Sequence, residues 1–124
     1  MKYKSLVIEL NLRFPILFQS ESFEKNELEI YSPGPHIVYG ETIVPYVKNL
    51  LRDEKNPVEL HQVFSFFEDI AQSEDEETRN LLQVTILESL WDEKEIYEKS
   101  QNYMFPATKQ INNLIGTYLR IPCE

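Results

Sequence analysis

The sequence predicts an all-α protein of five to six helices arranged in antiparallel pairs, for two reasons. Apolar side chains recur at steps of three and four residues along most of the chain, which is the period of an α-helix. The connections between these stretches are also short, and short connections make consecutive helices antiparallel neighbours. A helical bundle or a short HEAT-like stack of helical hairpins satisfies both. Stretches of similar length favour stacked pairs, although no sequence repeat is present; they begin at Asn56, Asp75, Asp92 and Pro106.

The centre of the predicted fold is a helical hairpin over residues 57–91. Asn56 can cap free backbone N–H groups, and Pro57 suits the first position of a helix. Asp75 can cap the second helix, and Glu76 and Glu77 then lie where the helix dipole favours negative charge. The first helix has its apolar face at Leu60, Val63, Phe64, Phe67, Ile70 and Ala71.

The second helix of the hairpin carries a wide apolar stripe, which predicts a central position in the fold. We expect it to bury Leu81, Leu82, Val84, Thr85, Leu87, Glu88 or Leu90, and Trp91. Phe66 lies about 100° from Phe67 around the first helix, so it must either pack on another element or stay exposed. We favour packing.

Two further helices are predicted before the hairpin. The first covers Tyr3 to Leu12, with Leu6, Val7 and Leu10 on one face, and Pro15 stops it. The second covers Ile43 to Arg52, where Pro45 is tolerated in the first turn. Between them, the sequence leaves open a short helix over Pro15 to Phe23 or irregular structure with a strand-like Leu28 to Tyr31. A tight turn is expected at Ser32 to His36, and an extended ordered loop at Ile37 to Tyr39.

Two helices follow the hairpin. Asp92 is expected to cap a helix through Met104 that Pro106 stops, with an inner face of Ile96, Tyr97, Ser100, Tyr103 and Met104. Pro106 opens the last helix, whose apolar positions are Ile111, Leu114, Ile115, Tyr118 and Leu119. Ile121 and Pro122 stop the chain.

Composition predicts a single helical domain over residues 1–124. That length is sufficient to bury one core, and the chain is 42% hydrophobic without an apolar run long enough to cross a bilayer. Glu9 and Arg13 fall where a signal peptide would need apolar residues. Cys123 is the only cysteine and can form no internal disulfide. These features indicate a cytoplasmic protein.

Charge is concentrated in one part of the chain. Between Asp53 and Lys99 there are 14 acidic and 4 basic residues, a net charge of −10, whereas the whole chain has −9. Such a field repels nucleic acid and attracts a basic protein partner, although acidic helices also serve solubility alone. We expect the partner to bind at the acidic starts of two helices, through Glu74, Asp75, Glu76, Glu77, Asp92, Glu93, Glu95 and Glu98. If the helices alternate in direction, these two groups lie at opposite ends of the molecule.

The sequence offers no catalytic, metal or cofactor signature. Three glycines cannot form a glycine-rich phosphate loop, and His36 and His61 lack the spacing of zinc ligands. His61 is expected to be partly buried beside the apolar stripe. Glu68 and Asp69 point in different directions, so they cannot act as an acid–base pair. Glu88 lies among apolar residues and is expected to have a structural partner, either His61, Arg79 or a tyrosine hydroxyl.

Four segments resemble a group of small acidic all-helical bacterial proteins. They are PHIVYGE (Pro35 to Glu41), HQVFSFFEDIA (His61 to Ala71), VTILESLWD (Val84 to Asp92) and NYMFPAT (Asn102 to Thr108). Some members of that group are immunity proteins associated with polymorphic or contact-dependent growth inhibition toxins. The resemblance implies a protein that binds and neutralises a cognate toxin domain without catalysis or cofactor. We expect the protein to be a monomer when free. Because nucleases are basic at their substrate groove, a nuclease toxin suits an acidic partner, and our first choice among nucleases is a ribonuclease.

Two other functions remain as alternatives to toxin immunity. One is a helical adaptor module for protein interactions that has no toxin partner. The other is an enzyme, for which Glu88 and His61 are the only starting pair that the sequence suggests. The adaptor is distinguished by the absence of a toxin-like open reading frame directly upstream, and the enzyme by a pocket where two ionisable groups converge.

Overall fold

A computed structural model describes residues 1–18 and 34–118, and each regular element in these ranges is a helix. The all-α prediction is therefore confirmed. The α-helices are α1 (Leu6–Arg13), α3 (Pro35–Glu41), α4 (Ile43–Asp53), α5 (Pro57–Ala71), α6 (Glu76–Leu81), α7 (Glu88–Leu90), α8 (Lys94–Ser100) and α9 (Pro106–Ile115). Two short 3₁₀ segments, η1 (Tyr3–Ser5) and η2 (Pro15–Phe18), flank α1, and a π-helical segment, η4 (Leu82–Leu87), joins α6 to α7.

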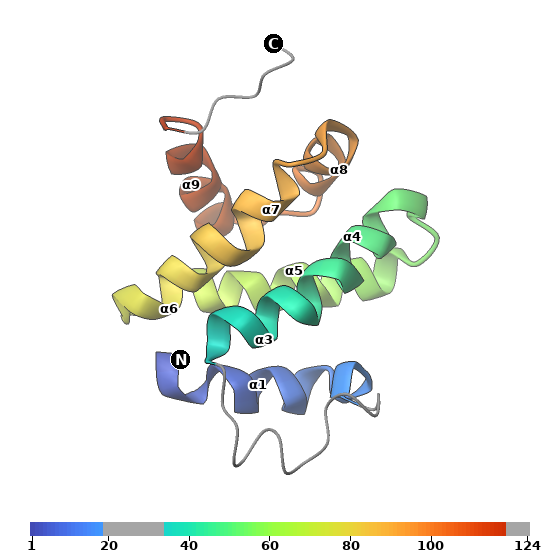
Figure 1. The fold of residues 1–124 in the computed structure, drawn as a ribbon. Helices are drawn as coiled ribbons and strands as arrows, with labels where there is room; N and C mark the ends of the chain where they lie inside the picture. The colour runs from blue at the N-terminus through green and yellow to red at the C-terminus, as the bar shows by residue number, and fades with distance from the viewer. Residues whose placement is uncertain (19–33, 119–124) are drawn as a thin grey trace.

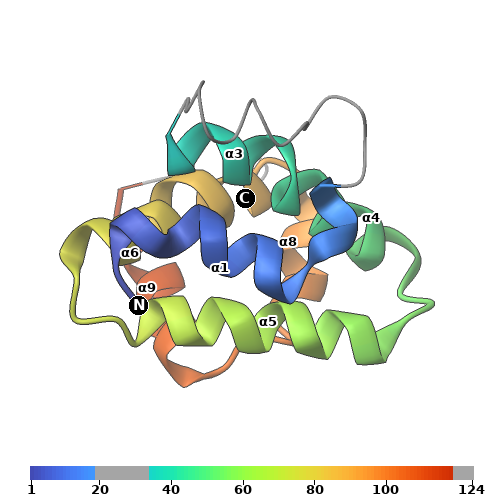
Figure 2. The same ribbon diagram turned by 90° about the horizontal axis from the view of Figure 1, so that it is seen from below.

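Helix α5 is antiparallel to the helices before it, whereas α1, α3 and α4 run in roughly the same direction (Figure 1). Helices α3 and α4 follow each other across the molecule, and α5 returns in the opposite direction behind them (Figure 1). The continuous stretch α6–η4–α7 then runs back across α5, and α8 and α9 lie beyond it. The view from below shows α1 alongside α5 (Figure 2). None of the helices in the described ranges is long and apolar enough to cross a bilayer.

One hydrophobic cluster holds these helices together. Phe64, Phe67, Leu81, Leu82 and Leu87 are completely buried in it, as predicted, and Trp91 is partly buried against it. Phe66 is also completely buried, because its ring packs against Phe14 (ring centroids 5.6 Å apart) and Tyr39 (6.3 Å). The interpretation of Phe66 as a packing residue is confirmed.

Local start signals predicted several helices correctly. The Asn56 side chain accepts a hydrogen bond from the Glu59 N–H (3.1 Å), and the Asp75 side chain accepts one from the Glu77 N–H (3.3 Å). Each is the N-cap of its helix, so α5 and α6 begin where the sequence indicated. The bounds of α1 and α4 also lie within three residues of their predicted bounds, and α4 begins at Ile43 as predicted.

The extended loop predicted at Ile37 to Tyr39 is wrong, because these residues belong to α3. Val38 and Tyr39 are buried, and the Tyr39 hydroxyl donates a hydrogen bond to the Leu6 carbonyl oxygen (2.6 Å). A segment this short, with two adjacent β-branched residues, does not form a stable helix alone. Contact with α1 stabilises the helix here.

The helix expected from Asp92 to Met104 is shorter than predicted. Its N-cap is Glu93, whose side chain makes no capping bond, and α8 ends at Ser100. The chain then turns between Lys99 and Tyr103 through two backbone hydrogen bonds. Three of the predicted inner-face residues are buried, namely Ile96, Ser100 and Met104, whereas Tyr97 and Tyr103 are partly buried.

Some residues expected in the core are exposed instead. Val84 is exposed because η4 has π geometry, in which equivalent positions are five residues apart, as in the buried pairs Leu81/Ile86 and Leu82/Leu87. Leu114 and Tyr118 are exposed near the end of α9. His61 is also exposed rather than partly buried, and its ring meets the edge of Phe105 (5.4 Å).

Several expectations lie partly or wholly outside the described residues. They are the choice between helix and strand over residues 19–31, the first part of the Ser32 to His36 turn, and the positions of Leu119, Ile121, Pro122 and Cys123.

Candidate protein-binding surface

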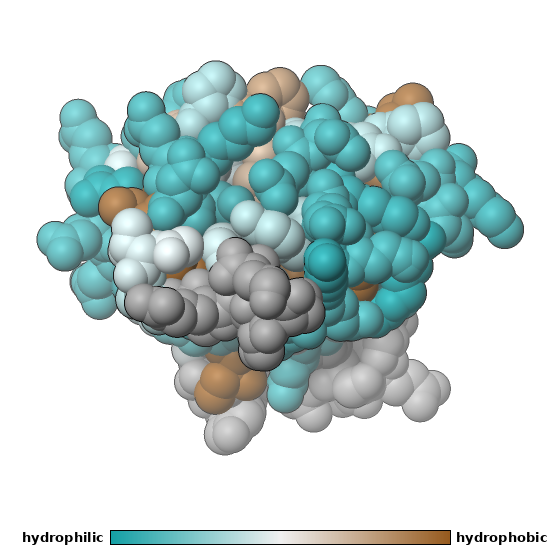
Figure 3. Space-filling view, turned by 90° about the horizontal axis from the view of Figure 1, so that it is seen from above, coloured by the Kyte–Doolittle hydropathy of each residue, from teal (hydrophilic) through white to brown (hydrophobic). Residues whose placement is uncertain are grey.

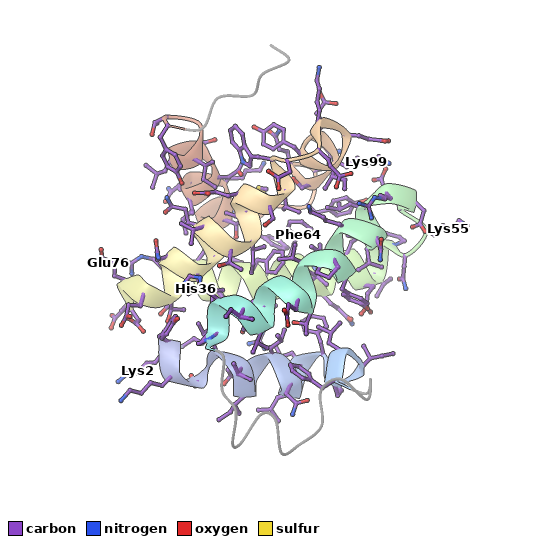
Figure 4. All side chains as sticks on the ribbon, in the orientation of Figure 1. Lys2, His36, Lys55, Phe64, Glu76 and Lys99 are labelled. Atoms are coloured by element: carbon purple, nitrogen blue, oxygen red, sulfur yellow. The ribbon has the colours of Figure 1, made fainter. Side chains whose placement is uncertain are left out.

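The acidic residues predicted to bind a partner fall into two groups, as their positions in the chain indicated. Glu74, Asp75, Glu76 and Glu77 surround the start of α6, whereas Asp92, Glu93, Glu95 and Glu98 surround α8. Glu76 on α6 and Lys99 on α8 lie on opposite sides of the molecule (Figure 4). The structure therefore does not bring the two groups together into one surface.

Asp75 has a structural role at the start of α6. Its carboxylate accepts hydrogen bonds from the Tyr3 N–H (2.7 Å), the Thr78 hydroxyl (2.9 Å) and the Glu77 N–H. The Tyr3 and Thr78 bonds hold the pKa of Asp75 below its ordinary value. Asp75 thus joins the N-terminal segment to α6, and it is less available to a partner than Glu74, Glu76 and Glu77.

An open groove of about 1360 Å³ borders the α6 group. Its walls come from the N-terminal segment and from the connection between α5 and α6. They carry both signs of charge, because Lys2 and Lys4 line the groove together with Glu74 and Glu77. Lys2 and Glu76 lie at the same end of the molecule (Figure 4). Glu74 and Glu77 line the same groove as the two lysines, whereas Glu76 does not.

Two of the four residues of the α8 group, Glu93 and Glu95, are paired with basic residues. The Glu93 carboxylate lies 3.1 Å from Arg52 and 3.7 Å from Lys48, and Glu95 lies 4.0 Å from Lys99. Exposed ion pairs of this kind contribute at most about 1 kcal/mol to stability. They do neutralise the local field, so α8 presents less net negative charge than its sequence suggests.

Most other acidic residues between Asp53 and Lys99 bond to groups of the protein itself. Tyrosine hydroxyls donate to Glu54 (Tyr103), to Glu59 (Tyr46) and to Glu88 (Tyr118). The expectation of a tyrosine partner for Glu88 is thus confirmed among its three alternatives. In the part of the chain that the structure describes, five acidic residues of this segment have no ion pair and no side-chain hydrogen bond: Glu74, Glu76, Glu77, Asp92 and Glu98.

Glu68 and Asp69 diverge, as predicted. Glu68 accepts hydrogen bonds from the start of α9, whereas Asp69 forms an ion pair with Arg13 (2.6 Å). The role of Glu68 was missed in the sequence because its partners, Ala107 and Thr108, are about 40 positions away. The sequence held one signal for this role: Pro106 opens a helix, and the residue before it, Phe105, has no side chain that can cap it. The free N–H groups of that helix therefore need an acceptor from elsewhere.

The residues suggested for catalysis do not converge. His61 lines a shallow hollow with Arg13 and Phe14, whereas Glu88 holds Tyr118 between η4 and the end of α9. His36 is occupied by the Thr85 hydroxyl, 2.5 Å from its Nδ1 atom. Within residues 1–18 and 34–118, no three histidine, cysteine or acidic residues are grouped as metal ligands.

Comparison with known proteins places the chain in one family. Residues 8–115 match the family model described as a domain of unknown function, DUF7674, so the chain belongs to that family. No curated protein and no solved structure matches it significantly.

Proposed function

We propose that this protein is a cytoplasmic immunity protein that binds and neutralises a basic toxin domain. The proposed toxin is a nuclease, and a ribonuclease is the first type to test. The acidic protein covers the active site of that toxin. It acts as a monomer, by binding rather than by catalysis, and uses no metal or cofactor. The resemblance of residues 35–108 to toxin-associated proteins motivates the choice of toxin.

One observation carries the proposal. The acidic segment supplies many residues to hydrogen bonds and ion pairs within the protein, yet Glu74, Glu76, Glu77, Asp92 and Glu98 stay exposed without a basic partner among the described residues. Like charges at the start of α6 repel each other, although the helix dipole offsets part of this at Glu76 and Glu77. A basic partner would relieve that repulsion and would associate faster because of it.

Co-expression with the product of the adjacent open reading frame tests the proposal. That product is expected to stop bacterial growth alone, and this protein is expected to restore growth and to co-purify with it. A variant with Glu74→Lys, Glu76→Lys and Glu77→Lys should bind less well, whereas Lys55→Glu, an exposed reversal at the opposite end (Figure 4), should not. Co-purification without growth inhibition would identify an adaptor instead of an immunity protein.

A further inference from the structure

Tyr118 is a surface aromatic that is fixed in position. It is 52% exposed, but the Gln83 side chain donates a hydrogen bond to its hydroxyl oxygen (2.8 Å), and that hydroxyl donates to Glu88 (2.6 Å). Partial burial and the Glu88 carboxylate raise the pKa of Tyr118, so the hydroxyl keeps its proton at neutral pH. A ring held in this way loses little conformational freedom when a partner packs on it.

The π-helical segment η4 makes this arrangement possible. Gln83 and Glu88 are five residues apart, and in an α-helix they would point about 140° away from each other. In η4 the Glu88 N–H instead bonds to the Gln83 carbonyl oxygen, which places both side chains on the side that faces Tyr118. Single π-turns are frequent at functional sites. The unusual helix geometry and the fixed tyrosine are therefore one feature.

Two further apolar side chains are exposed close to Tyr118 or Gln83 in the chain. Leu114, on α9, lies four residues before Tyr118 and is 55% exposed, and Val84 follows Gln83 in η4 and is 38% exposed. We call Val84, Leu114 and Tyr118 the Tyr118 patch. Where described residues are visible, the face on which α8 and α9 lie is mostly hydrophilic, with apolar residues at isolated places (Figure 3). A small apolar centre within a polar surround is the usual composition of a protein-binding site.

Acidic residues lie near Val84 on the helical stretch α6–η4–α7. Glu76, Glu77 and Glu88 lie on the same helical stretch, α6–η4–α7, as Gln83 and Val84, and none of these acidic residues is buried. Glu76 and Glu77 have no basic partner among the described residues, as shown above. Arg79, the one basic residue on this stretch, donates to the Ser73 carbonyl oxygen (2.7 Å) at the start of α6. A partner surface that complements this one is therefore apolar at its centre and basic at its rim.

We propose that the Tyr118 patch is the centre of the surface on which a basic protein domain docks. Val84, Leu114 and Tyr118 supply the apolar contact, and Glu76 and Glu88 form the acidic rim. The inference rests on the proposed function and deepens it, because it assigns the toxin domain to the α6–η4–α9 face rather than to α8. Aromatic anchors inside a polar rim carry a large share of binding energy.

Matched double variants test the assignment with the product of the adjacent open reading frame as the probe. The test variant is Leu114→Ser with Tyr118→Ser, and the control is Ile8→Ser with Leu12→Ser, whose side chains on α1 are 62% and 70% exposed. The test variant is expected to raise Kd about tenfold or more, mainly through faster dissociation, while the control leaves Kd unchanged. Leu114→Ser alone repeats the test without disturbing the Tyr118 hydrogen bonds. Circular dichroism confirms that each variant is folded.

Each other outcome is decisive. If the wild-type protein binds the probe and both patch variants bind it equally well, the docking surface is wrong and the proposed function stands. If the wild-type protein does not bind the probe, both are wrong. Sedimentation of the wild-type protein as a dimer that Leu114→Ser dissociates would show that a second copy covers the patch, and it would overturn a basic partner there.

Discussion

Glu68 on α5 caps the start of α9 through Thr108. One carboxylate oxygen of Glu68 accepts hydrogen bonds from both the N–H and the hydroxyl of Thr108, each 2.9 Å long, and the other accepts one from the Ala107 N–H (3.0 Å). Phe105 occupies the N-cap position and cannot cap, and Pro106 has no N–H to satisfy. A side chain from another helix thus satisfies the free donors of α9 and fixes α9 against α5.

Replacement of Glu68 by alanine is expected to destabilise the protein. Loss of a capping side chain costs about 1–2 kcal/mol, since two backbone donors and a buried hydroxyl lose their acceptor. Urea unfolding at neutral pH measures the free energy of unfolding. Glu98→Ala is the matched control, because Glu98 is exposed and makes no bond within the described residues, and its change should stay within about 0.5 kcal/mol. Equal effects of the two substitutions would show that the cap contributes nothing.

The same interaction predicts a pH dependence of stability. Partial burial alone would raise the pKa of Glu68, but the bonds from Thr108 and Ala107 outweigh burial and hold the pKa below its ordinary value of 4.5. A carboxyl with a lowered pKa in the folded state binds protons more readily when the protein is unfolded. Stability therefore rises as the pH increases from the folded-state pKa to the unfolded-state pKa. The contribution of Glu68 is complete above pH 4.5 and is lost as the pH falls further.

Thermal melts between pH 3 and pH 7 measure that dependence. The difference in melting temperature between the wild-type protein and Glu68→Gln should be largest at neutral pH and should shrink below pH 4.5. A difference that stays constant over the whole range would mean that the charge of Glu68 does not matter to the cap.

Local signals in the sequence predicted one part of this fold and could not predict another. Asn56 and Asp75 cap helices that begin within three residues, so their role follows from the sequence alone. Glu68 caps a helix that begins about 40 residues later, and no local pattern indicates that. Helix α3 was missed for the same reason, because the contact of Tyr39 with Leu6 stabilises it.

The candidate surface shows a different limit. An α-helical period placed Val84 in the core, whereas the π-helical segment buries Ile86 and Leu87 and leaves Val84 exposed. Composition located the acidic segment correctly, but it could not show which carboxylates are already bonded. Glu93 pairs with Arg52 from a helix 41 residues earlier in the chain, and only the three-dimensional structure shows this contact.

The aromatic core predicts a large loss of stability for one substitution. Phe67 is completely buried, and its ring meets Phe64 edge-on, with centroids 5.1 Å apart. Truncation to alanine leaves a cavity among α5 and its neighbours and is expected to cost about 3–5 kcal/mol. Chemical denaturation measures it, with Tyr97→Ala as a control on a partly exposed ring. A loss below about 1 kcal/mol at Phe67 would mean that the side chain is not in the core.

Charge reversal on α6 is expected to slow association with the basic partner. Glu76→Lys with Glu77→Lys should lower the association rate and weaken its dependence on salt, because these exposed carboxylates attract the partner over about 10 Å at 0.1 M salt. Neutralisation by Glu76→Gln with Glu77→Gln should give an intermediate rate. Stopped-flow mixing with the adjacent gene's product at low and high salt measures the rates.

The same reversal on α8 is expected to behave differently. Glu93→Lys places a third positive charge beside Lys48 and Arg52, so it should lower the free energy of unfolding. The α6 reversal breaks no ion pair and loses only the interaction with the helix dipole, so it should lower the free energy of unfolding less. The prediction that Asp92 caps this helix is wrong, because the N-cap of α8 is Glu93. Replacement of Asp92 is therefore not expected to cost a helix cap. If the wild-type protein associates at the same rate at low and high salt, the unpaired carboxylates do not steer a partner, and their contribution is to solubility.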